Sequence, residues 1–305
     1  YTICYYNYRH FLSSLYIFFR SVYYFSMTIK TRNSLMKVFF VFSLLCCAIL
    51  LACFITATAL HQIVPPQETG ANRPLPAVLS ALPFLHTSFT ATMIAIGILV
   101  ISVPVTMFLL FHFFENTQSS EIIFFTGVLG GMLCESMRFL IPLFGLGMSF
   151  SHVLLIAGRI LIFGRLAVPL CSLCIAIFSD PQQRQDVERN VAIALSVSAV
   201  CAAGIPLNTA QITTTCAVSI GFSAVFAIVR FLIFALTMLS FAINAKKHDS
   251  PELKKMLLYY YLVLIVGYSL LLRADTFVVL ALGAAALAYG TVSFLRTLHR
   301  LYKWK

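Results

Sequence analysis

Unbroken apolar runs of about 20 to 30 residues are the feature of this sequence that most restricts its fold. Each run is long enough for an α-helix to cross the roughly 30 Å hydrocarbon core of a bilayer. Within lipid, every backbone N–H and C=O must be satisfied inside the protein, which leaves only helices and closed barrels. The runs lack the short alternating segments of a barrel. The sequence therefore predicts an all-α, polytopic transmembrane helix bundle.

The runs divide into about eight predicted spans, or seven if the first one is cleaved. They form a bundle at residues 38–297, between an N-terminal segment (1–37) and a basic tail (298–305). The predicted spans are 38–60, 86–114, 121–145, 152–178, 191–207, 213–244, 256–273 and 275–297.

The first 26 residues differ from the rest, because they hold seven of the thirteen tyrosines. Met27 is followed by Lys30, Arg32 and Lys37 and then by an apolar run, which is the layout of a translation start and a first hydrophobic segment. Two interpretations stay open. Residues 1–26 are either not translated or form an interfacial segment rich in Tyr and Phe.

The first apolar run, 38–60, also has two interpretations. Leu50-Leu51-Ala52-Cys53 resembles a loose lipobox, and Ala57-Thr58-Ala59 resembles a signal-peptidase site. The run stays apolar well past Cys53, which favours a retained helix over a cleaved signal.

Charge is scarce and unevenly placed. Only 10% of residues are charged, against roughly 25% in a soluble domain, yet the formal net charge is +11. With alternating spans, thirteen basic residues fall at one set of helix ends, and only Arg73 and Arg273 at the other. This bias predicts cytoplasmic termini and a place in the cell inner membrane, with anionic lipid headgroups as contacts and no nucleic-acid partner. The thirteen are Lys30, Arg32, Lys37, Arg184, Arg189, Lys246, Lys247, Lys254, Lys255, Arg296, Arg300, Lys303 and Lys305.

Five ionisable residues lie inside the predicted spans, where each costs several kcal/mol unless it is paired or hydrated. One interpretation is a cationic pocket for a small anionic compound or a lipid headgroup, because arginine forks match carboxylate and phosphate. The other is a structural network completed by backbone carbonyls, hydroxyls, Asn208 and water. The five candidates are Glu135, Arg138, Arg159, Arg165 and Arg230.

Signals of catalysis or cofactor binding are weak, so neither an enzyme activity nor a cofactor or metal site is predicted. Cys171 and Cys174 form a CxxC inside an apolar run, where small residues usually serve helix packing. His61, His86 and His152 share one predicted side, and interfacial placement explains them more simply than a metal site does.

Four short motifs resemble uncharacterised multi-span inner-membrane proteins of spirochaetes. They are Glu121–Phe125, Glu135–Arg138, Gly158-Arg159 and Phe163–Arg165, all within residues 110–180. The resemblance implies an inner-membrane location and no particular activity.

Three functions remain open from the sequence. The unmatched arginines favour a transporter or permease for a small anionic compound. A sensory or scaffold subunit would act through partners at the basic loop around residues 246–255. A lipid-handling enzyme would use His86 and His152.

Overall fold

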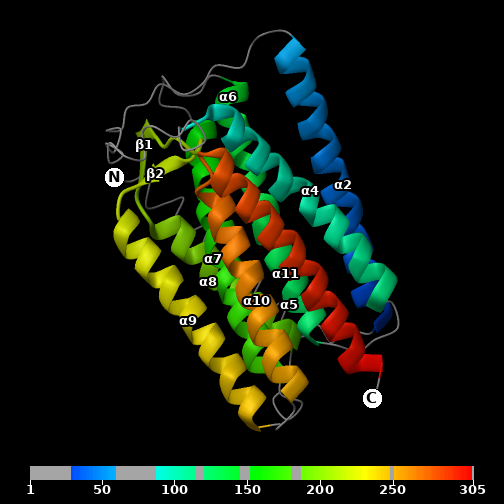
Figure 1. Ribbon diagram of the computed structural model, residues 1–305. Helices are drawn as coiled ribbons and strands as arrows, with labels where there is room; N and C mark the ends of the chain where they lie inside the picture. The colour runs from blue at the N-terminus through cyan, green and yellow to red at the C-terminus, as the bar shows by residue number, and fades with distance from the viewer. Residues whose placement is uncertain are drawn as a thin grey trace.

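The computed structural model describes residues 29–59, 87–114, 120–144, 152–179, 187–247 and 251–303. Several predictions fall outside these ranges: the segment 1–26, the loop after the first span, His61 and His86. The rest of the chain is a bundle of long helices with one small hairpin, so the predicted all-α polytopic fold is confirmed (Figure 1). The helices are α2 (Ile29–Ala59), α4 (Phe89–Phe114), α5 (Ser120–Leu133), α6 (Leu140–Leu143), α7 (His152–Phe178), α8 (Val187–Gly204), α9 (Ser223–Lys247), α10 (Pro251–Leu272) and α11 (Phe277–Lys303).

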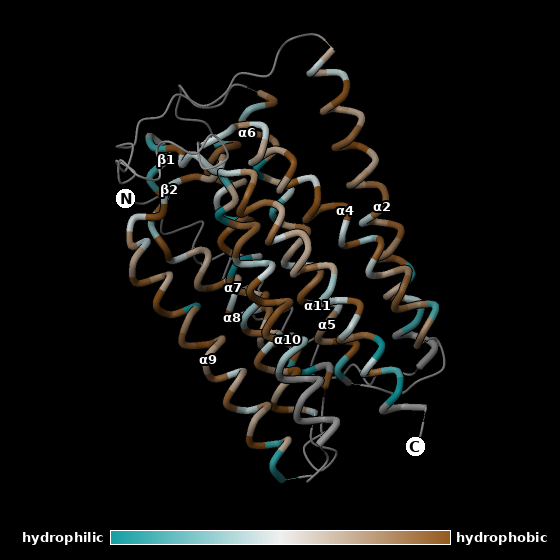
Figure 2. The backbone as a smooth tube through the Cα atoms, viewed as in Figure 1, coloured by the Kyte–Doolittle hydropathy of each residue, from teal (hydrophilic) through white to brown (hydrophobic). Residues whose placement is uncertain are grey.

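The helices run antiparallel from one end of the bundle to the other (Figure 1). Among the described residues, six helical segments are long and apolar enough to cross a membrane. The shorter α8 has 18 residues, or about 27 Å of helix. We call the end with the β-strands the hairpin end, and the opposite end, which carries Lys37, Lys246, Lys247 and Arg300, the basic end. Figure 2 shows hydrophobic residues along the helices and hydrophilic ones gathered near both ends.

The third predicted span is not a uniform α-helix. Between α5 and α6 the chain tightens into a 3₁₀ segment, η2 (Cys134–Phe139). Runs of 3₁₀ helix this long within a helix are uncommon and mark strained or functional places. Glu135 and Arg138 both lie on this segment.

The predicted start of the sixth span at residue 213 is wrong. Strands β1 (Leu207–Ile212) and β2 (Val218–Ile220) form an antiparallel hairpin there, and helix α9 begins only at Ser223. Pro206 cannot continue the preceding helix, and the β-branched residues that follow favour strands. Helix α11 continues past the predicted end of the last span at residue 297, as far as Lys303.

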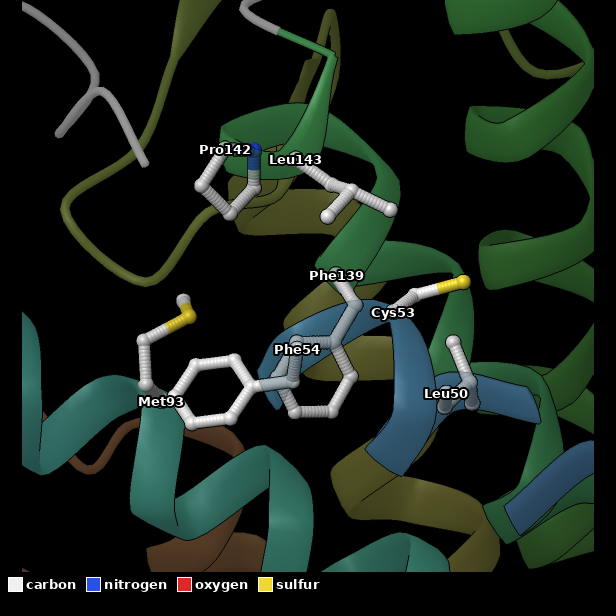
Figure 3. A pocket seen from close by; sticks show the side chains of 7 residues that line it. All are labelled: Leu50, Cys53, Phe54, Met93, Phe139, Pro142 and Leu143. Carbon is white, nitrogen blue, oxygen red and sulfur yellow. The ribbon is translucent and has the colours of Figure 1, made fainter. Parts of the chain in front are cut away.

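Helix α2 lies at the edge of the bundle and packs on α4 and α6. Figure 3 shows its Leu50, Cys53 and Phe54 facing residues of α4, η2 and α6 around a pocket of about 10 Å³. The rings of Phe54 and Phe139 lie 5.8 Å apart there. This pocket is only large enough for about one water, so it is a packing defect and not a ligand site. Whether α2 is retained or cleaved stays a prediction.

Glycines set the closest helix contacts. A Cβ atom on Gly164 of α7 would lie 2.5 Å from the carbonyl oxygen of Gly131 on α5. On the other side of the bundle, a Cβ on Gly267 of α10 would lie 2.4 Å from the backbone nitrogen of Leu287 on α11. Small residues allow such close approach of helices in membranes. Both close contacts therefore depend on glycine.

Candidate functional site

The site begins at η2, near the hairpin end of the bundle. Glu135 and Arg138 are both fully buried, and Nη1 of Arg138 lies 3.5 Å from Oε2 of Glu135. In a 3₁₀ helix, side chains three residues apart stand one above the other. The local helix geometry therefore holds this acid and base on the same edge.

Arg165 of α7 forms the stronger ion pair with the same carboxylate. Its Nε donates to Oε1 of Glu135 at 2.9 Å, and its Nη2 donates to Oε2 at 3.2 Å. This two-point geometry is the favoured way for a guanidinium to hold a carboxylate. The neighbouring contact of Gly164 with Gly131 brings α7 close enough to α5 for the pair to form.

Arg138 also ties the hairpin to the helices. Its Nε donates to the backbone oxygen of Thr215 at 2.7 Å, in the turn between the two strands. Its Nη2 is buried and has no hydrogen-bond partner among the described residues. Cys216, next in the turn, has a φ of 53° and is fully buried. Arg138 thus anchors a turn of unusual backbone shape to the 3₁₀ segment.

Arg159 belongs to a different part of the structure. Its Nη1 donates to the carbonyl oxygens of Ala202, Ala203 and Ile205, the last of these at 2.8 Å. These carbonyls end helix α8, where the last turn has no helical N–H partners. A cation at a helix C-terminus also interacts favourably with the helix dipole. Arg159 is therefore a capping residue and not part of the Glu135 cluster.

Arg230 of α9 is the candidate without a partner. Its Nε is buried and has no hydrogen-bond partner in the described part of the chain. Its guanidinium carbon lies 5.9 Å from the ring centre of Phe226, a cation–π distance. The side chain as a whole is half-buried, and that contact is too weak to compensate a full charge within a membrane span. Arg230 is thus held in the membrane region with its charge unmatched.

Arg230 and Arg165 line one cavity of about 760 Å³. The hairpin closes it at one end, α9 and α10 form its sides, and Arg165 reaches it from α7. Ligand sites commonly have volumes of about 300 to 1,000 Å³. Helices α9 and α10 are joined at the basic end and separate toward the hairpin end, as the colours yellow and orange show in Figure 1.

The cavity carries an excess of positive charge. Arg165, Arg230 and Arg273 all line it, and only Arg165 has an acidic partner among the described residues. Glu135 is already shared between Arg138 and Arg165. A bound anion would supply the missing negative charge, and the hydroxyls of Thr213, Thr215, Ser219, Ser223 and Ser269 offer further hydrogen bonds.

Two residues near the cluster were not predicted from the sequence. Arg273 was assigned only to a helix end, although it lies in the same cavity as Arg230. The hydroxyl of Tyr268 on α10 is buried with no hydrogen-bond partner among the described residues. The position of Arg273 at the end of a predicted span was the only sequence signal for its role. Nothing in the sequence indicated Tyr268.

The remaining candidates have structural explanations. Cys171 packs on Gly127 of α5, since a Cβ there would lie 2.8 Å from its Sγ, which fits the packing interpretation of the CxxC. His152 is exposed at the start of α7. Among the described residues, no three His, Cys, Asp or Glu side chains gather as a metal site would require.

No protein-family model, curated protein or solved structure matches this chain. The resemblance to spirochaete inner-membrane proteins stays a prediction.

Proposed function

We propose that this membrane protein binds an anionic compound in the cavity between α9 and α10 and carries it across the bilayer as a transporter or permease. One observation carries the proposal: Arg230 lines a cavity of ligand size without an ion-pair or hydrogen-bond partner among the described residues. An unmatched charge within a membrane span destabilises a fold unless something compensates it. A bound anion is the simplest compensation.

The place of the cavity supports transport over binding at a surface. Arg230 is seven residues into α9, about 10 Å along the helix from its first residue, Ser223. Ionisable residues at such depth in membrane proteins typically mark substrate or ion pathways. The 3₁₀ segment η2, which holds Glu135 against Arg165, lies beside this cavity and offers a place where the helices could adjust.

Thermal unfolding of the purified full chain tests the binding step. The panel would pair small carboxylates, phosphates and sulfates with uncharged analogues. A ligand at a hundredfold excess over its Kd stabilises the folded state by about 2.7 kcal/mol. We expect at least one anion to raise the melting temperature of the wild type and neither Arg165→Gln nor Arg230→Gln to respond.

The matched control is Arg296→Gln, because Arg296 is an exposed arginine of α11 outside the cavity. It should respond to the same anion as the wild type does. Uptake of that anion into liposomes containing the protein then tests transport. If no anion stabilises the wild type, the proposal fails, and a role through protein partners at the basic end becomes the better account.

A further inference from the structure

The cavity is not polar throughout, and its two halves differ in chemistry. On α9 its lining runs from Ser223 to Met238, sixteen residues spanning about 22 Å. The half next to the hairpin holds the arginines and the hydroxyl groups. We call this the head half, and call the half toward the basic end, lined by Phe231, Phe234, Met238, Leu262, Ile265 and Val266, the tail half.

The tail half opens onto the lipid-facing surface. Phe231 lines the cavity and is still 71% exposed, and Leu262 and Val266 on the opposite side are 41% and 45% exposed. In a bundle of membrane helices, exposed apolar side chains face acyl chains. The cavity is therefore continuous with the bilayer between α9 and α10.

A soluble anion does not explain the tail half. Such an anion would leave these apolar side chains in contact with water, which is unfavourable by about 25 cal/mol for each Å² exposed. Acyl chains would cover them without that penalty. The same molecule would need a negative group at the depth of Arg230 and further contacts with Arg273 and the hydroxyls.

We propose that the ligand is an anionic lipid, which enters from the bilayer between α9 and α10 with its headgroup at Arg230 and Arg273 and its acyl chains along the tail half. This inference rests on the proposed anion binding and specifies the class of substrate. Charge complementarity selects the headgroup, and the lateral opening selects a molecule already dissolved in the membrane.

Native mass spectrometry of the full chain tests the inference. The protein, in a neutral detergent, would first receive equal amounts of dioleoylphosphatidylglycerol and dioleoylphosphatidylcholine, which carry the same acyl chains. It would then be released from the detergent in the mass spectrometer. We expect the anionic lipid to remain bound with about tenfold preference, because the arginines attract its net negative charge, whereas the choline cation of phosphatidylcholine cancels that charge. Arg230→Gln should abolish most of this preference, and Arg296→Gln should keep it.

A second variant distinguishes binding of the whole lipid from binding of its headgroup alone. Ala235 is an exposed alanine of α9 that lines the tail half, and Ala285 is an exposed alanine of α11 outside the cavity. Ala235→Trp should block retention of the anionic lipid, and Ala285→Trp should not. Thermal unfolding with glycerol 3-phosphate measures binding of the free headgroup, which Ala235→Trp leaves intact.

The outcomes are distinct. If glycerol 3-phosphate stabilises the chain through Arg230 but neither lipid is preferred, the proposed anion binding stands and the lipid inference is wrong. Equal retention of both lipids, or a lipid-free dimer that Ala235→Trp dissociates, also overturns the inference. If neither glycerol 3-phosphate nor phosphatidylglycerol binds and the wider anion panel fails as well, the proposed function falls with it.

Discussion

At the scale of single residues, the four arginines of the membrane region have three different roles. Arg138 and Arg165 share Glu135, Arg159 caps α8, and Arg230 has no partner among the described residues. All four lie within predicted spans. Glu135 and Arg138 are three residues apart, a spacing that favours their pairing on one helix face. The sequence could not assign the others, because the partners are distant: Thr215 lies 77 positions from Arg138, and Ala202 lies 43 from Arg159.

Removal of the shared carboxylate should strongly lower the stability of the fold. Glu135→Gln leaves two buried arginines without an anion, and breaking a buried ion pair costs about 3–5 kcal/mol. We expect a large fall in the melting temperature of Glu135→Gln. The double variant Glu135→Gln/Arg165→Gln should lose less than the sum of the single changes, since it removes one of the orphaned charges. Simple additivity would show that the pair does not couple.

Arg159→Gln and Arg230→Met should shift stability in opposite directions. Arg159→Gln removes the charged donor from the partly exposed carbonyls at the end of α8, and a hydrogen bond to a charged group is worth about 1.5–3 kcal/mol. Arg230→Met removes a charge that has no ion-pair or hydrogen-bond partner among the described residues, so its melting temperature should rise. Thermal unfolding without added ligand measures both. A fall for Arg230→Met equal to that for Arg159→Gln would mean that Arg230 is a structural residue.

At the scale of elements, the long helices were easier to predict than local backbone shape. Among the described residues, six helical segments are long and apolar enough to cross a membrane, as the apolar runs predicted. The hairpin was missed because Ala217–Ile220 is apolar enough to extend the next span, while the strand pairing depends on contacts such as Leu207 with Ile220. The 3₁₀ segment η2 likewise leaves no trace in hydropathy.

The contact between Gly131 and Gly164 can be tested by comparing two glycine-to-alanine substitutions. Gly164→Ala would place its Cβ 2.5 Å from the carbonyl oxygen of Gly131, so α5 and α7 must separate. Overpacking of this kind typically costs about 1–3 kcal/mol, and here it also strains the Glu135–Arg165 pair. Gly97→Ala on α4 has no atom within 4 Å of the new Cβ and should be neutral or stabilising, because alanine favours helix. Equal melting temperatures for the two variants would contradict the packing described.

At the scale of the whole molecule, hydropathy alone predicts the helix bundle, and charge predicts its orientation. The basic end holds Lys37, Lys246, Lys247 and Arg300, and we propose that this end faces the cytoplasm. What hydropathy could not predict is the lateral separation of α9 from α10. That separation depends on how side chains of α7, the hairpin, α9 and α10 pack in three dimensions.

Cysteine labelling tests the orientation in intact cells. Thr214→Cys lies in the exposed turn of the hairpin, and Lys247→Cys lies at the end of α9 on the basic end. With a membrane-impermeant maleimide, we expect Thr214→Cys to react directly and Lys247→Cys only after the membrane is permeabilised. The unsubstituted chain supplies the background from native thiols. The reverse pattern would invert the proposed topology.

The central claim is that the cavity between α9 and α10 holds an anion against Arg230. Crystals of the full chain grown with phosphatidylglycerol whose acyl chains carry bromine test it most directly. We predict anomalous scattering from bromine along Phe231 and Met238, with headgroup density within hydrogen-bonding distance of Arg230. Helices α9 and α10 packed tightly against each other, with Arg230 paired to a carboxylate of the chain, would contradict the claim.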